Sequence, residues 1–261
     1  MSTPHIRIPR GEVIVELRNV TKCFGDRAVL DDVSCSIRAG ETTVIIGPSG
    51  TGKSVFLKHL VGLLRPDSGQ VLVAGQDVPT LDDPALFELR KRFGMLFQDG
   101  ALFDSMSVGE NIAFPLRHHT AKSDDEIARR VAEVLAMVGL PGIEEREPAA
   151  LSGGMRKRVG LARAIALEPE IVLFDEPHSG LDPVMSDTID KLIVSMKARL
   201  GSTFIVISHD IAGTFQIADT IGMLWKGKLI AFGPKQEVME SQDPVLRQFF
   251  ERRADGPMTL V

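Results

Sequence analysis

The chain has 261 residues, of which 44% are hydrophobic and 25% charged, a composition typical of a globular protein that buries a full core. Its formal net charge of −5 argues against a nucleic-acid partner, because general nucleic-acid binders carry a net basic surface. Cys23 and Cys35 have neither redox-pair nor zinc spacing, and no stretch approaches the roughly 18 apolar residues of a membrane span, so a reducing, cytoplasmic location is expected.

The first third of the chain predicts strands and a phosphate-binding loop. An apolar run at residues 43–46 leads into residues 47–54, which fit the Walker A pattern G-x-x-x-x-G-K-[ST] at every fixed position. Glycines let such a loop curl so that its backbone N–H groups point at a triphosphate. Lys53 can reach the β- and γ-phosphates, and Ser54, at a helix start, can bind Mg²⁺. The expected ATP-binding residues of this loop are Gly47, Pro48, Ser49, Gly50, Thr51, Gly52, Lys53 and Ser54.

Short strands are also expected on either side of this loop, and helices after it. Residues 13–20, 33–37 and 71–74 predict an antiparallel layer beside the nucleotide-binding sheet. Residues 80–94 predict a short helix whose N-cap is Asp82 or Asp83. From Ser107 onward the chain carries helix starts and few strand signals, which indicates an inserted helical subdomain. Ser107 and Ser123 each begin a capping box.

The second half of the chain returns to strands. Residues 171–174 form an unbroken apolar run, typical of a strand covered on both faces. A helix is expected over residues 183–200 and a strand over 203–208, which together predict a parallel crossover. Residues 220–232 predict a hairpin that turns at Lys226 and Gly227. An amphipathic segment and a loose end at residues 254–261 should follow.

Two acidic residues follow the strand at 171–174. Asp175 is placed to hold Mg²⁺, directly or through water, and Glu176 can polarise a water for attack on the γ-phosphate. The alternative is a pair of solvated loop acids, which the Walker A loop in the same chain makes less favoured. Water as the acceptor also disfavours a phosphotransferase that acts on a small molecule.

A second anion-binding element occurs at Ser152, Gly153 and Gly154, where a serine and two glycines open another predicted helix. A single ATP already enclosed by the Walker A loop leaves only its outer face for a second grip. The economical arrangement is a head-to-tail homodimer, in which each ATP lies between the Walker A loop of one chain and the Ser152 loop of the other.

These motifs together resemble the ATPase subunits of ATP-binding cassette (ABC) transporters. Walker A, Gln98, the Leu151–Gly154 signature, Asp175 with Glu176, and residues 179–182 occur in the family order and are followed by His209. The resemblance implies that Phe24 stacks on adenine, although tyrosine is more usual there, and that Gln98 links Mg²⁺ and water to the transporter partner. It further implies that Asp182 acts across the dimer and that His209 contacts the γ-phosphate. Taken alone, Phe24 could be a core aromatic, Gln98 a surface amide and His209 a strand-end histidine.

The resemblance also implies a fold and a domain organisation. An α/β P-loop NTPase of the ABC ATPase type is expected, with a mostly parallel core sheet, an antiparallel β subdomain and an inserted helical subdomain. The single domain of residues 1–261 would comprise a nucleotide-binding core at about 13–98 and 168–232, a helical subdomain at about 99–167 and a C-terminal extension at about 233–261.

The residues after Gln98, Met155 in place of the usual glutamine after the signature, and the tail at 243–250 are similar to those of Mla/Mce-type lipid-transport ATPases. This resemblance implies hydrolysis of ATP that drives phospholipid transport between inner and outer membranes. The implied partners are integral membrane permease subunits, an MCE-domain lipid-binding protein and a small STAS-domain protein, with the chain held at the cytoplasmic face of the inner membrane. Alternatives are an ABC ATPase for another solute, such as an amino acid or organic solvent, and a soluble regulatory ATPase.

Overall fold

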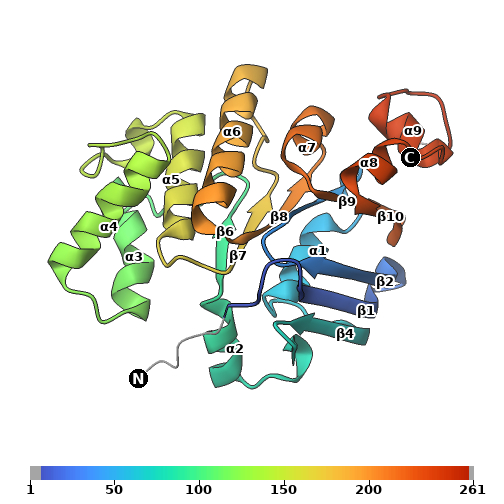
Figure 1. The fold of residues 1–261 in the computed structure, drawn as a ribbon, viewed down its shortest axis with the longest axis horizontal. Coiled ribbons are helices and arrows are strands. Elements are labelled where there is room, and N and C mark those ends of the chain that lie inside the picture. The colour runs from blue at the N-terminus through green and yellow to red at the C-terminus, as the bar shows by residue number, and fades with distance from the viewer. Residues whose placement is uncertain (1–6, 259–261) are drawn as a thin grey trace.

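A six-stranded sheet forms the centre of the computed structural model, which describes residues 7–258 (Figure 1). The strand order is β10-β9-β3-β8-β7-β6, in which β9 to β6 are parallel and β10 pairs antiparallel with β9. The predicted mostly parallel core sheet is therefore confirmed. Its strands are β3 (Thr42–Ile46), β6 (Phe93–Leu96), β7 (Ile171–Asp175), β8 (Thr203–Ser208), β9 (Thr220–Trp225) and β10 (Lys228–Pro234).

A second, four-stranded sheet packs beside the first and is antiparallel throughout, in the order β2-β1-β4-β5. Its strands alternate between buried and exposed residues, the pattern of a sheet with one solvated face. The predicted antiparallel layer is confirmed. Its strands are β1 (Val13–Phe24), β2 (Arg27–Arg38), β4 (Ser68–Val73) and β5 (Gln76–Asp77).

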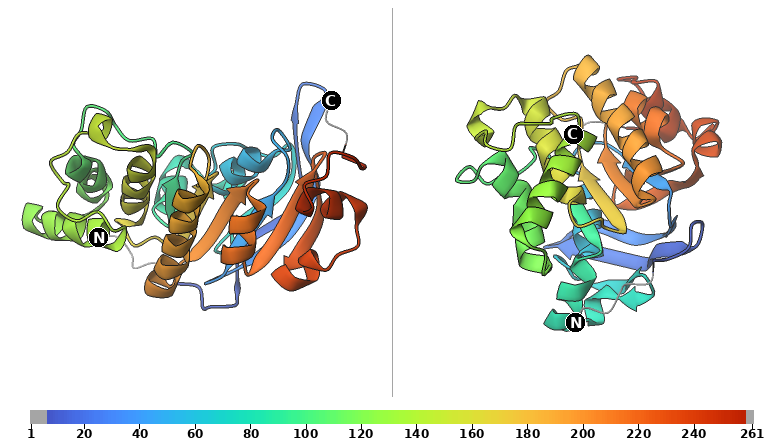
Figure 2. Two further views of the ribbon diagram at one scale, coloured as in Figure 1. Left: turned by 90° about the horizontal axis from the view of Figure 1, so that it is seen from above. Right: turned by 60° about the vertical axis from the view of Figure 1, so that its left-hand side comes forward.

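Helices cover the sheets and extend the molecule at both ends. Figures 1 and 2 place α3, α4 and α5 together at one end and α8 and α9 at the other. The helices are α1 (Lys53–Leu60), α2 (Asp83–Arg90), α3 (Val108–His119), α4 (Asp124–Met137), α5 (Gly153–Ile165), α6 (Pro183–Leu200), α7 (Ile211–Ile217), α8 (Lys235–Met239) and α9 (Pro244–Phe250), with short 3₁₀ turns at Val78–Thr80 and Pro148–Ala150. No helix in the described part of the chain is long and apolar enough to span a bilayer.

The central strands contribute side chains to two hydrophobic cores, one on each face of the sheet. Alternate residues of β7 point to opposite sides, with Val172 and Phe174 in the core shared with the helical end, and Leu173 in the core shared with the antiparallel sheet. The side chains that point to either core are fully buried. This two-sided burial explains why the strand is a continuous apolar run, and it leaves polar side chains only at the strand ends.

The helical end of the molecule begins where its capping boxes predict. The Ser107 and Ser123 hydroxyls accept hydrogen bonds from the backbone N–H groups of Glu110 and Glu126, the third residues of α3 and α4. The carboxylates of these two glutamates accept in turn from the N–H groups of the serines. Each box satisfies two N–H groups that a helix otherwise leaves unpaired.

The expected helix over residues 80–94 is wrong at its C-terminal end. Asp82 caps α2, and the helix stops at Arg90, after which Phe93 and Gly94 begin strand β6. A Cβ at Gly94 would lie 2.1 Å from the carbonyl oxygen of Ala164 in α5. Close packing of the edge strand on α5 therefore determines this segment, and a local helical pattern carries no information about that contact.

The expected loose end is also wrong over residues 254–258. Met258 is buried, and its N–H donates to Gln248 Oε1 over 2.6 Å, so the chain folds back on α9. The remaining part of that expectation, residues 259–261, lies outside the described residues.

Candidate active site

The Walker A loop connects β3 to α1 through three glycines with positive φ, namely Gly47 (148°), Gly50 (77°) and Gly52 (101°). A Cβ on Gly47 would lie 2.2 Å from the carbonyl oxygen of Leu224, and one on Gly52 would lie 2.6 Å from that of Val29. Both the backbone angles and the close approaches therefore require glycine. The loop is a cradle of the shape and polarity that a phosphate chain needs at the start of a helix.

Lys53 is the first residue of α1 and is 6% exposed. Its Nζ donates to the carbonyl oxygens of Gly47 and Pro48 over 2.7 and 2.9 Å, and it lies 3.6 Å from Glu176 Oε1. Burial lowers the pKa of Lys53, while the nearby carboxylates of Glu176 and Asp175 oppose that shift. The ammonium is thus held inside the loop, where an anion would meet it.

Ser54 and Asp175 come together from different elements. The Ser54 hydroxyl donates to Asp175 Oδ1 over 3.2 Å, so the second residue of α1 meets the end of β7. Burial raises the pKa of Asp175, and the hydrogen bond from Ser54 acts against that change. A hydroxyl and a carboxylate at this spacing are oxygen donors of the kind that Mg²⁺ prefers, so the donor set fits this ion.

Glu176 follows Asp175 and has φ of 51°, a left-handed angle that costs energy outside glycine. Its backbone N–H donates to the Ile207 carbonyl oxygen over 3.0 Å, and its Oε2 lies 2.6 Å from His209 Nδ1. The structure thus brings Glu176 and His209, two of the four predicted catalytic side chains, into direct contact. The turn at Glu176 points a strand-end carboxylate toward Lys53.

Most of these groups, but not Gly47 or Asp175, line a hollow of about 350 Å³ at the carboxyl ends of the parallel strands. Gln98 lines it and donates from Nε2 to the Ser179 hydroxyl over 3.0 Å. The predicted residues in its wall are Ser49, Gly50, Gly52, Lys53, Ser54, Gln98, Glu176 and His209. Carboxyl ends of neighbouring strands are where open α/β sheets bind their ligands.

Ser152 does not line this hollow, and Asp182 does not either. Ser152 is exposed at the N-cap of α5, where its hydroxyl accepts from the Met155 N–H, and Gly153 and Gly154 form the first turn. Asp182 is exposed at the N-cap of α6 and accepts from the N–H groups of Val184 and Met185. Within one chain the second anion-binding element is therefore separate from the Walker A hollow.

Phe24 lies at the tip of the β1–β2 hairpin, 49% exposed, with Lys22 Nζ 5.7 Å from its ring centre. It is not a core residue, which excludes that alternative. Its pairing partner Arg27 lines a hollow of about 360 Å³ next to the Walker A loop, together with Trp225. The adenine contact stays a prediction.

The model of the ABC transporter family matches residues 30–179, which include both the Walker A loop and the Ser152 element. This chain belongs to the ABC transporter family. As an ABC ATPase subunit it binds ATP and hydrolyses it to ADP and phosphate.

Individual relatives extend this match over nearly the whole ABC subunit. The chain is 48% identical over 252 residues to the probable ribonucleotide transport ATP-binding protein mkl of Mycobacterium leprae, covering 97% of this chain and 72% of the relative. It is 42% identical over 245 residues to the intermembrane phospholipid transport system ATP-binding protein MlaF of Haemophilus influenzae, covering 94% and 93%. A dimeric post-hydrolysis structure of the ATP-binding cassette MJ0796 with ADP and Pi has a TM-score of 0.77 at 33% identity, covering 85% and 98%.

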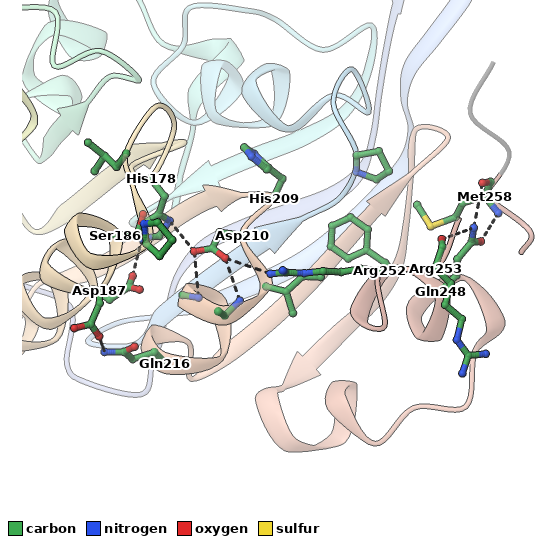
Figure 3. A pocket seen from close by; sticks show the side chains of 18 of the residues that line it. His178, Ser186, Asp187, His209, Asp210, Gln216, Gln248, Arg252, Arg253 and Met258 are labelled. Atoms are coloured by element: carbon green, nitrogen blue, oxygen red, sulfur yellow. Dashed lines mark hydrogen bonds and ion pairs between the residues drawn. The ribbon is translucent and has the colours of Figure 1, made fainter. Parts of the chain in front are cut away.

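A larger hollow of about 960 Å³ adjoins the site of this ABC subunit, between α6, α7 and the C-terminal segment (Figure 3). Asp210 caps α7 there, with Arg252 3.9 Å away on one side and His178 Nδ1 3.8 Å away on the other. His178 is buried, and its Nε2 is 2.6 Å from Asp190.

In the sequence, His178 lacks metal-site spacing with carboxylates or cysteines, which favours a structural or solvated side chain. The structure places it among two aspartates and next to the segment that carries Glu176. No spacing rule detects this cluster, since its members come from three different elements.

Proposed function

We propose that the chain drives phospholipid transport between the inner and outer membranes, as one of two ATPase subunits that pair head to tail. The observation that carries the composite site is the exposed N-terminus of α5 at Ser152, which lies apart from the Walker A hollow of its own chain. A helix N-terminus with an exposed serine and two glycines binds an anion well. The γ-phosphate of a nucleotide held by a second copy supplies that anion.

Four side chains carry the hydrolysis in this proposal. Lys53 holds the β- and γ-phosphates, since its ammonium already lies within the loop. Glu176 is the general base that orients and deprotonates the attacking water, and His209, 2.6 Å from it, fixes the carboxylate and contacts the γ-phosphate. Gln98 holds the Ser179 hydroxyl and thereby connects the attacking side of the site to the segment that leads to Asp182.

Ser54, Gln98 and Asp175 are the proposed Mg²⁺ ligands, because they supply neutral and anionic oxygens beside the phosphate cradle. The ion, when bound, neutralises charge on the β- and γ-phosphate oxygens. Asp175 contributes its carboxylate next to Ser54, and the Walker A loop contributes by holding the phosphates against its N–H groups. Phe24 is proposed to cover the adenine and Asp182 to act across the dimer.

A second surface supports docking to a membrane permease. A groove of about 660 Å³ runs along α2, β6 and α3, and Phe87, Phe97 and Phe103 in it are 49%, 42% and 44% exposed. Three exposed phenylalanines in one groove form an apolar patch suited to a partner helix. The permease is proposed to hold the chain at the cytoplasmic face of the inner membrane. The wider complex is proposed to include an MCE-domain protein and a STAS-domain protein.

The cargo proposal rests on the MlaF relative, whose match covers nearly the full length of both chains, and on the residues after Gln98. The competing cargo is a ribonucleotide, from the name of the mkl relative. Purification of the complex from native membranes should recover a permease, an MCE-domain protein and phospholipid. Recovery with a soluble receptor for amino acids, sugars or nucleotides would contradict the lipid assignment.

Mixing two defective chains tests the composite site. Lys53→Ala disrupts phosphate binding by the Walker A loop, and Ser152→Arg disrupts phosphate binding by the N-terminus of α5. Neither homodimer then has an intact composite site, whereas a mixed pair has one. With Glu176→Gln in both chains to suppress turnover, ATP-dependent pairing measured by light scattering should appear in the mixture and stay weak in each variant alone.

Loss of the helix cap itself needs a control, because removing an N-cap costs about 1 kcal/mol. Ser123→Arg removes the equivalent cap from α4 and should leave pairing intact. Equal failure of the mixture and of the separate variants would mean that Ser152 does not bind the neighbour's nucleotide.

A further inference from the structure

Lys157 is a buried cation in the middle of α5, 4% exposed, that no part of the phosphate chemistry uses. Its Nζ lies within hydrogen-bond distance of three backbone carbonyl oxygens on one loop: Ser179 at 2.5 Å, Pro177 at 2.8 Å and Glu176 at 3.4 Å. One ammonium group thereby caps the whole segment between the proposed general base and Ser179.

The loop that Lys157 holds is strained and functionally placed. Glu176 has a left-handed φ of 51°, and a backbone in that region persists only when its surroundings fix it. Around it, Ile207 accepts from the Glu176 N–H, and Gln98 donates to the Ser179 side chain. Lys157 is the contribution of α5 to this support, and it acts on the carbonyl side of the loop.

Packing alone does not explain a lysine at this position. Burial lowers the pKa of Lys157, and the neighbouring carboxylates of Asp99 and Glu176 oppose the change. A methionine of similar length would fill the space without the cost of burying a charge. An ammonium has three N–H donors for these carbonyl oxygens, whereas an apolar side chain would leave those of Pro177 and Ser179 without this donor; the Glu176 carbonyl oxygen also accepts from the Ser179 N–H over 3.1 Å.

The N-cap of the same helix is Ser152, which precedes Lys157 by five residues and therefore lies about 7.5 Å away along the axis. We propose that Lys157 is a positioning residue that transmits contact of the α5 N-terminus with the partner's nucleotide to Glu176 of its own chain. This inference rests on the proposed head-to-tail pair. ATP bound in one site would thus affect the position of Glu176 in the other site through α5, which moves as a rigid element when its N-terminus contacts the nucleotide.

Lys157→Met separates this role from nucleotide binding. In the assembled complex kcat should fall about 10²-fold, the scale of a misplaced catalytic group, while KM for ATP changes less than about threefold, because Lys157 does not line the phosphate hollow. Lys157→Gln restores two N–H donors without the charge and should recover about tenfold of that loss. Lys191→Met, the same chemical change at an exposed site on α6, should leave both constants unchanged.

ATP-dependent pairing distinguishes the proposed role from a general structural defect, because a structural defect would reduce pairing as well as turnover. In the Glu176→Gln background, Lys157→Met should still pair in ATP, since the Ser152 end of α5 is intact, whereas Ser152→Arg should not pair. A kcat within twofold of the wild type for Lys157→Met would overturn the inference, and so would loss of pairing in parallel with loss of turnover. Failure of the Glu176→Gln chain itself to pair would instead overturn the composite site.

Discussion

Glu176→Gln tests the proposed general base most directly, because it removes one charge and almost no volume. The carboxylate contacts His209 Nδ1 over 2.6 Å and lies 3.6 Å from Lys53 Nζ. The amide oxygen of glutamine can still accept from His209, so the side chain keeps its position and loses mainly its basicity. The change should therefore affect the chemical step and leave the fold intact.

The structure also predicts that ATP binding survives. Glu176 is 16% exposed, and two unit charges 3.6 Å apart attract by about 4–5 kcal/mol at an effective dielectric constant of about 20. Removing that attraction frees Lys53 for the phosphates and removes a negative charge from their side of the hollow. Affinity for ATP should stay within about threefold of the wild type or increase.

Hydrolysis should be about 10²–10⁴ slower, the usual loss for a general base, which corresponds to about 3–5 kcal/mol in the barrier. Phosphate release from the assembled complex measures the rate, and light scattering in ATP and Mg²⁺ should detect a paired state that accumulates. Asp187→Asn, which neutralises an exposed acid on α6, is the matched control and should hydrolyse normally. Normal turnover by a Glu176→Gln chain that remains monomeric would refute the assignment.

Two further predictions concern packing and thiol chemistry. Gly94→Ala should lower the free energy of unfolding by about 1–3 kcal/mol through overpacking against Ala164, which a lower Tm would show. Gly233→Ala is the control and should leave Tm unchanged, because its Cβ would have neighbours no closer than 3.8 Å. Equal Tm values for the two variants would show that β6 and α5 approach less closely than described. Burial raises the pKa of Cys35 to about 12, so at pH 8 roughly one Cys35 thiol in 10⁴ is ionised. A thiol reagent should therefore modify the exposed Cys23 in the folded protein and Cys35 only after unfolding. Rapid reaction of both thiols in the folded protein would contradict this prediction.

The sequence predicted those parts of the site that are contiguous or end a strand. The Walker A loop, Asp175 and Glu176 follow apolar strands, and polar residues at such ends must gather at one edge of a parallel sheet. Their mutual contacts follow from that rule. The boundary between α2 and β6 did not follow, since Gly94 is placed by α5, more than 50 residues later in the chain.

Lys157 and His178 were beyond prediction for the same reason. Each has a side chain whose partners come from other elements, and neither lies in a spacing pattern that a general rule describes. A basic cluster on a helix is ordinarily a solvated face, so the sequence of residues 156–158 alone favours exposed side chains. Only the tertiary structure distinguishes the buried member, Lys157, from exposed Arg156.

Phe97 and Gln98 are consecutive in the chain but line different surfaces. Phe97 belongs to the aromatic groove proposed for the permease, and Gln98 belongs to the nucleotide hollow. A single peptide unit thus separates the groove proposed for the permease from the Walker A hollow. Substitution of the exposed groove residues Phe87 and Phe103 alters neither hydrophobic core nor the Walker A loop, so the proposed docking surface can change while the ATPase site stays the same. In the proposed complex, a displacement of the docked permease would be transmitted to the Walker A hollow across this one peptide linkage, which is planar and nearly inextensible.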